Sequence, residues 1–61
     1  MKLEFNPEAD AAYLELTDST VEKSSEIQLD IIVDYDAEEQ IIGIEILYVG
    51  KRAKPSLKKV A

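Results

Sequence analysis

The chain has 61 residues, with 13 acids against seven bases, and it contains neither cysteine nor histidine. A chain of this length forms one domain at most and buries only about 60% of its unfolded surface. The composition excludes disulfides and thiolate metal sites, and it removes the commonest metal ligand and general base. No apolar run approaches the ~20 residues that span a bilayer, and the N-terminus has no apolar signal sequence. We therefore expect a cytoplasmic protein.

Charge is divided unevenly along the chain. Residues 1–50 hold all 13 acids and two lysines, a net charge of −11, whereas residues 51–61 hold five bases, a net charge of +5. This division predicts a single acidic domain, residues 1–50, and a basic C-terminal tail, residues 51–61. The asymmetry favours a basic partner, or a tail that lies on its own domain. The alternative is that the acids only solvate a sheet and the tail is disordered.

The N-terminal part of the chain predicts a β-hairpin. Apolar and polar residues alternate on both sides of a turn signal at residues 6–10, which also suits a single helical turn. Pairing Leu3 with Leu14 aligns the apolar faces of the two strands. The same register sets Lys2 opposite Glu15, which is an opposite-charge pair.

The middle of the chain predicts a second hairpin, with strands Ile27–Tyr35 and Ile41–Val49. Both stretches alternate with period two and are rich in β-branched residues, which favours strands over helices. Before them, residues 17–20 form a polar break and residues 21–26 are ambiguous. One alternative is that the third strand already begins at Ser24.

Two registers bring the apolar faces of the second hairpin together. One register sets Asp30 opposite Glu45, and like charges directly opposite one another are unfavourable. The other sets Ile32 opposite Glu45 and leaves a four-residue loop. We expect the second register, and a bulge would change it.

These elements predict a mainly β fold, a small four-stranded antiparallel meander of two hairpins with a short turn or helical turn at the C-terminus. A turn that begins at Ser56 would provide the C-terminal element. Domains need two packed layers, and nothing in the chain is long enough to cover the apolar face of one sheet. We expect a homodimer with two sheets packed face to face, and strong sheet curvature is the competing solution.

Two segments resemble a known family. They are Phe5-Asn-Pro-Glu-Ala-Asp-Ala-Ala-Tyr-Leu-Glu-Leu16, and Asp34-Tyr-Asp36 followed by Gly43-Ile-Glu-Ile-Leu47. Both are similar to motifs of the prokaryotic family Domain of Unknown Function 2283, over roughly residues 2–50. The chain departs from the family at Asn6, where Asp is usual, and at Glu39, where the turn usually has Gly. The resemblance implies no catalytic residue, and by association with small toxins it implies an antitoxin-like role.

A calcium loop of the EF-hand kind is one interpretation of the acids in the second hairpin. The residues at loop positions 1, 3, 5, 8 and 12 are Asp34, Asp36, Glu38, Ile41 and Glu45. Position 6 lacks the required glycine, and the flanking segments predict strands rather than helices. Glu15, Asp34 and Glu45 also suggest a glycosidase-type carboxylate pair, but the chain has too little bulk for a cleft. We expect no metal, no cofactor and no enzyme activity.

We therefore expect a non-enzymatic interaction module, antitoxin-like, that forms a homodimer or other homo-oligomer and binds a small basic protein. The alternative is a metal- or nucleic-acid-binding protein that uses the acidic sheet face or the basic tail. Direct nucleic-acid binding is disfavoured because the acidic domain repels phosphates, and no membrane contact is expected. The candidate interaction residues are Tyr13, Glu15, Ile32, Asp34, Ile41, Glu45, Leu47, Lys51 and Arg52.

Overall fold

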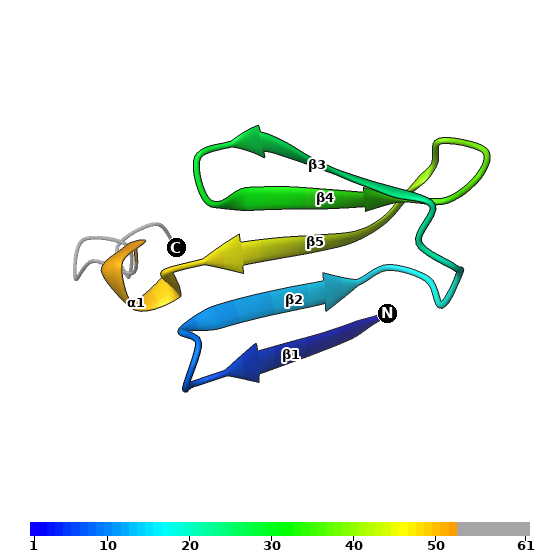
Figure 1. Ribbon diagram of the computed structural model, residues 1–61. Coiled ribbons are helices and arrows are strands. Elements are labelled where there is room, and N and C mark those ends of the chain that lie inside the picture. The colour runs from blue at the N-terminus through cyan, green and yellow to red at the C-terminus, as the bar shows by residue number, and fades with distance from the viewer. Residues whose placement is uncertain (53–61) are drawn as a thin grey trace, which may run out of the picture.

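The computed structural model describes residues 1–52, which form one antiparallel sheet of five strands followed by a short helix (Figure 1). The order across the sheet is β1-β2-β5-β4-β3, so the last strand in the sequence is the central one. No helix of this part of the chain is long and apolar enough to cross a membrane. The elements are β1 (Lys2–Asn6), β2 (Ala11–Glu15), β3 (Lys23–Gln28), β4 (Ile31–Tyr35), β5 (Ile41–Leu47) and α1 (Val49–Arg52).

The mainly β antiparallel fold is confirmed, but the prediction of four strands was wrong. The expected strand Ile27–Tyr35 is divided between β3 and β4 by a tight turn at Leu29 and Asp30. Asp30 has a φ of 64° and its N–H donates to Glu26 Oε2 at 3.0 Å. Aspartate tolerates this left-handed conformation better than most residues. Leu29 lies in the turn but still fits the alternation of apolar and polar residues. The period-two pattern alone therefore does not predict that the strand is divided.

The meander order was also wrong. Strand β2 pairs with β5 and not with the strand that follows it in the sequence. Strand β5 is the longest, and its sequence Ile-Ile-Gly-Ile-Glu-Ile-Leu is the most apolar of the five. A central position gives this strand a hydrogen-bonded neighbour on both edges, and this arrangement leaves the polar strand β3 at the outside.

The predicted registers are confirmed over most of their length. Leu3 opposes Leu14 and Lys2 opposes Glu15 in the first hairpin. Ile32 opposes Glu45 between β4 and β5, as the avoidance of like charges predicts. The register then shifts after Asp34, where an irregularity interrupts the pairing. Charge pairing therefore predicts the register, but it does not predict the local bulge.

Asp10 accepts two hydrogen bonds from the segment that follows β5. Its backbone carbonyl accepts from Val49 N–H at 3.0 Å, and its carboxylate accepts from Gly50 N–H at 3.0 Å. The chain leaves the sheet at Tyr48, which has a φ of 56°, so the expected strand extension to Val49 was wrong. A short C-terminal helical turn is present as α1, which crosses the expected domain boundary at residue 50. The turn expected at Ser56, like the rest of the tail, lies outside the described residues.

Side-chain carboxamide and carboxylate oxygens hold the two other turns. Asn6 Oδ1 accepts from the backbone N–H groups of Glu8 and Ala9, so a tight turn stands where a helical turn was also considered. Asp36 Oδ1 accepts from the N–H groups two and four residues later, both at 2.9 Å. Glu39 adopts a left-handed φ of 64° in that loop. A glutamate thus occupies a left-handed position that glycine adopts without strain.

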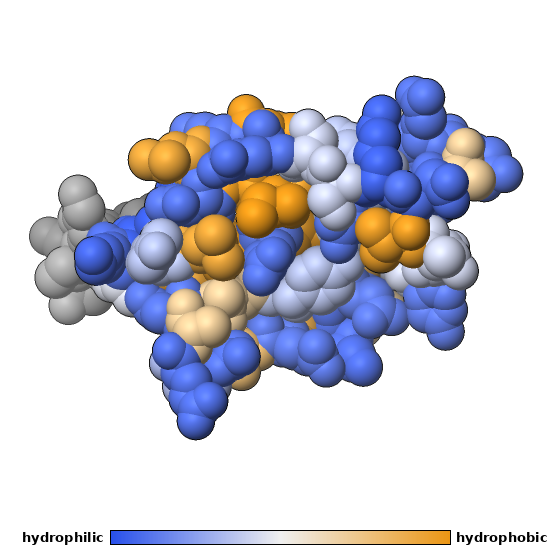
Figure 2. Space-filling model, viewed as in Figure 1, coloured by the Kyte–Doolittle hydropathy of each residue, from blue (hydrophilic) through white to orange (hydrophobic). Residues whose placement is uncertain are grey.

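The two faces of the sheet differ in composition. The apolar face carries Leu3, Phe5, Ala12, Leu14, Ile31, Val33, Ile44 and Ile46, and the polar face carries Lys2, Glu4, Tyr13, Glu15, Ser24, Glu26, Ile32, Asp34, Gly43, Glu45 and Leu47. The view onto the polar face shows polar residues around scattered apolar ones (Figure 2). Helix α1 lies beyond the end of the sheet and covers neither face (Figure 1).

Very little of this molecule is buried. Among residues 1–52 the buried hydrophobic side chains are Ala11, Val33 and Ile42. Leu3 is 71% exposed and Phe5 is 56% exposed, although both belong to the apolar face. The apolar face is thus exposed at its β1 side and buried at Val33, and its other members are half-buried: Ala12, Leu14, Ile31, Ile44 and Ile46.

The left-handed residue in the β4–β5 loop gives a stability prediction. Replacing Glu39 with Gly removes a strain of about 1–2 kcal/mol and adds unfolded-state entropy worth about 0.4–1 kcal/mol. We expect Glu39→Gly to raise the free energy of unfolding by about 0.5–1 kcal/mol in urea denaturation. The matched control Glu38→Gly lacks the strain and should lower it. Equal effects of the two substitutions would contradict the account.

Candidate interaction site

Most of the candidate residues lie together on the polar face. Tyr13 on β2 opposes Glu45 on β5, which in turn opposes Ile32 on β4. Glu15 and Asp34 both oppose Gly43 from its two sides. The cluster is thus built on three adjacent strands at the centre of the sheet, where backbone pairing fixes each Cα.

A bridge of hydrogen bonds crosses the polar face. Tyr13 Oη donates to Asp34 Oδ2 at 2.7 Å, and Ser24 Oγ donates to Asp34 Oδ1 at 2.6 Å. The tyrosine ring reaches Asp34 by passing over Gly43, where an added Cβ would lie 1.9 Å from the phenol oxygen. We call Tyr13, Gly43, Asp34 and Ser24 the tyrosine bridge. It joins β2, β4 and β3 across β5 with side chains alone.

The carboxylates around the phenol change its acidity. The hydrogen bond to Asp34 raises the pKa of Tyr13 from 10.0 to about 12, and burial and the charges of Asp34, Glu15 and Glu45 add to this shift. Each of these effects disfavours a tyrosinate anion. The phenol therefore remains a hydrogen-bond donor throughout the physiological pH range.

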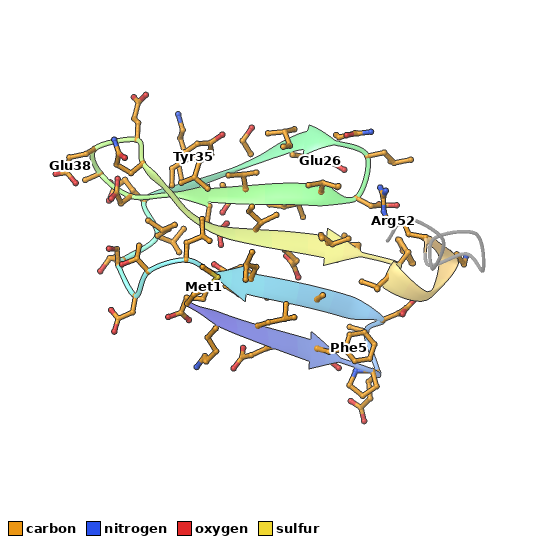
Figure 3. The ribbon with its side chains drawn as sticks, turned by 180° about the vertical axis from the view of Figure 1, so that it is seen from behind. Met1, Phe5, Glu26, Tyr35, Glu38 and Arg52 are labelled. Atoms are coloured by element: carbon orange, nitrogen blue, oxygen red, sulfur yellow. The ribbon has the colours of Figure 1, made fainter. Side chains whose placement is uncertain are left out.

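The other candidate residues lie apart from the tyrosine bridge. Ile41 is 48% exposed and opposes Tyr35 beyond the irregularity in β4. Lys51 Nζ lies 5.4 Å from the centroid of the Tyr48 ring. Arg52 Nη2 donates to the carbonyl oxygen of Leu29 at 2.7 Å, which attaches α1 to the β3–β4 turn (Figure 3). The basic residues thus lie at one end of the sheet, and the acids of the bridge lie at its centre.

The acids of the calcium interpretation have other partners. Asp34 accepts from two hydroxyls of the bridge, and Asp36 accepts from N–H groups of its own loop. Within residues 1–52 no group of three or more acidic side chains is arranged to hold a metal ion. The flanks of the loop are strands rather than helices. The structure therefore gives the calcium loop no support.

An open depression of about 640 Å³ lies beside the bridge. Its lining includes Glu4, Phe5, Ala11, Tyr13 and Glu45. Two carboxylates at the rim and an aromatic ring form a surface for a cationic or amphipathic group. Its open shape suits a side chain of a partner better than an enclosed small molecule.

Sequence reasoning missed three residues of these sites. Gly43 interrupts an otherwise β-branched strand, and such a glycine signals a close approach by another group. Asp10 is the last residue of the first turn, and only the structure reveals that its carboxylate accepts a hydrogen bond from Gly50 N–H of α1. Ser24 belongs to a strand whose pairing depends on the unpredicted turn at Leu29, so no sequence signal identified it.

The contact between Tyr13 and Gly43 predicts non-additive stability. Gly43→Ala should lower the free energy of unfolding by about 1–3 kcal/mol, because the added methyl group overlaps the phenol. In a Tyr13→Ala background the same substitution should have less than about a third of this effect. Urea denaturation of the four chains measures the coupling. Equal effects in both backgrounds would exclude the steric explanation.

The raised pKa of Tyr13 predicts an alkaline loss of stability. Because the pKa is higher in the folded state, the contribution is complete below pH 10 and disappears as the pH rises through about 12. The free energy of unfolding of the native chain should therefore fall more between these pH values than that of Tyr13→Phe. Tyr35→Phe is the matched control, because it removes one phenol and leaves the hydrogen bond from Tyr13 to Asp34 in place. Parallel curves for the native chain and Tyr13→Phe would contradict the assignment.

Comparison with known families agrees with the resemblance read from the motifs. The sequence model of the family described as "Protein of unknown function (DUF2283)" matches residues 2–49. The chain has no match among curated proteins and none among solved structures. The matched segment contains all five strands and the whole tyrosine bridge. The chain therefore belongs to the family of proteins of unknown function DUF2283.

Proposed function

We propose that this protein is a non-enzymatic protein-interaction module that assembles by packing its apolar face against the apolar face of a second copy. The observation that carries the proposal is that residues 1–52 form a single layer, with Leu3 and Phe5 more than half exposed. Monomeric proteins rarely expose contiguous apolar surface of this kind. Burial of apolar area contributes about 25 cal/mol per Å², so a second layer would supply much of the stability that one sheet lacks.

A second copy is a suitable second layer. Two antiparallel sheets pack face to face with their inner side chains interdigitated, at a spacing of about 10 Å. A twofold contact needs one self-complementary surface, and the aliphatic side chains of the apolar face carry no charge to oppose themselves. Packing on this face leaves the polar face and its tyrosine bridge outward. Small domains without disulfides or metals commonly gain stability in this way.

The outward face favours a basic protein as the further partner. Glu4, Glu15, Glu26 and Glu45 lie on it, whereas Lys2 is its one basic residue in the described part of the chain. The depression between Tyr13 and Glu45 has a shape and charge that suit a lysine or arginine side chain. Covering a small basic protein in this way is what an antitoxin-like role would require.

A pair of matched substitutions tests the apolar contact. Ile44→Lys places a charge on the apolar face, and Ile32→Lys places the same charge on the polar face, both at half-buried positions. We expect Ile44→Lys to halve the solution mass measured by sedimentation equilibrium, because it buries an unpaired charge in the contact. Ile32→Lys should leave the mass unchanged, and circular dichroism checks that both chains fold. Unchanged mass for Ile44→Lys, or a monomeric native chain, would refute the proposal.

Salt dependence tests the binding of a basic partner. A lysine-rich peptide should bind the native chain more weakly as ionic strength rises, because the surface charges become screened. The double variant Glu15→Gln with Glu45→Gln should lower the affinity about tenfold, whereas Glu38→Gln in the distant loop should have little effect. Calorimetric titration measures all three chains. Equal loss in both variants would show that only net charge matters and that the polar face is not the site.

A further inference from the structure

The two edge strands of the sheet are protected to different degrees. Strand β3 carries an irregularity between Glu26 and Gln28, and most of its residues are polar. Strand β1 pairs with β2 in an unbroken register, and all five of its residues are exposed. Natural proteins usually protect an edge with a bulge or a covering segment, and within residues 1–52 β1 has neither.

We propose that β1 pairs with β1 of a second copy in an antiparallel register centred on Leu3. Three properties of the strand support this choice of partner. A twofold axis at Leu3 sets Lys2 opposite Glu4 of the second copy, and it does so twice. It brings the two Leu3 side chains together on the apolar face. It also sets Met1 opposite Phe5 of the second copy, where a thioether can contact an aromatic ring.

Neighbouring registers are less favourable. An axis at Glu4 sets the two Glu4 carboxylates directly opposite one another. A shift by a single residue turns the apolar face of one copy to the polar side of the other. The register at Leu3 is the one that matches both charge and face. It makes a continuous sheet of two copies with one extended apolar face.

The charged groups of Lys2 and Glu4 already lie close together within one chain. Lys2 Nζ lies 3.5 Å from Glu4 Oε2 of its own chain, and both side chains are more than half exposed. In the paired strands each lysine would lie between its own glutamate and that of the second copy. Met1 and Phe5 lie at the outer strand of the sheet, clear of α1 and of the loops at the far edge (Figure 3). The edge is therefore free of steric obstruction within the described residues.

This contact uses a different surface from the face-to-face contact of the proposed function. The face contact packs one sheet on another, and the edge contact joins two sheets side by side. The two contacts together give a tetramer. The two contacts can also fail separately. A native chain that is a dimer, becomes a monomer in Ile44→Lys and does not respond to changes in β1 would retain the face contact and refute the edge contact.

Exchange of the two charges tests the register. Lys2→Glu and Glu4→Lys each create two like-charge pairs, and each should raise the dissociation constant of the edge contact about tenfold. The double variant Lys2→Glu with Glu4→Lys restores opposite charges and should return the constant to within about twofold of the native value. Sedimentation equilibrium of the full chain measures the constants, and circular dichroism checks folding. Additive weakening in the double variant, or no change in the single variants, would overturn the proposal.

Disulfide trapping gives a second test, because the chain has no cysteine of its own. Under mild oxidation a mixture of Lys2→Cys and Glu4→Cys chains should form the mixed disulfide at least tenfold faster than either chain cross-links with itself. Both positions belong to the polar face, so the face contact does not bring them together. Ser24→Cys on the opposite edge is the control and should remain unlinked. Equal rates for all combinations, or no cross-link in the mixture, would overturn the register.

Discussion

The constraint on which this structure depends is that one sheet of five strands has two faces and only one layer. Backbone pairing satisfies the strands within the layer, but it does not shelter their side chains. The described residues bury little more than Ala11, Val33 and Ile42. The proposed contact between two copies follows from this imbalance, because apolar surface that residues 1–52 leave exposed is available to another chain.

Side-chain hydrogen bonds on the polar face connect the strands of this single layer. Tyr13 crosses Gly43 and reaches Asp34, which also accepts from Ser24, so β2, β4 and β3 are linked across β5. Asp10 and Arg52 attach the short helix to the two turns at one end of the sheet. These links lie on the polar face and at one end of the sheet, and none of them crosses the apolar face. The apolar side chains therefore remain available to pack against a second sheet.

Period-two alternation and cross-strand charge pairing predicted an antiparallel β fold and most of the two registers. Two sequence motifs indicated the family. The prediction failed where the chain reverses its direction while the alternation of apolar and polar residues continues. Leu29 continues the apolar alternation while the chain reverses at Asp30. The alternation therefore predicted neither the fifth strand nor the partners of Ser24. The position of β5 between β2 and β4 is a long-range choice that strand patterns do not encode. The tyrosine bridge required the register and the glycine to be considered together.

The central claim is that folding of this sheet is coupled to the covering of its apolar face by a second copy. The dependence of the thermal unfolding midpoint on chain concentration tests this claim most directly. If a second copy supplies the missing layer, the midpoint should rise steadily as the concentration increases from micromolar to millimolar. A cooperative transition whose midpoint is the same at every concentration would show that the chain is stable alone, and it would contradict the account.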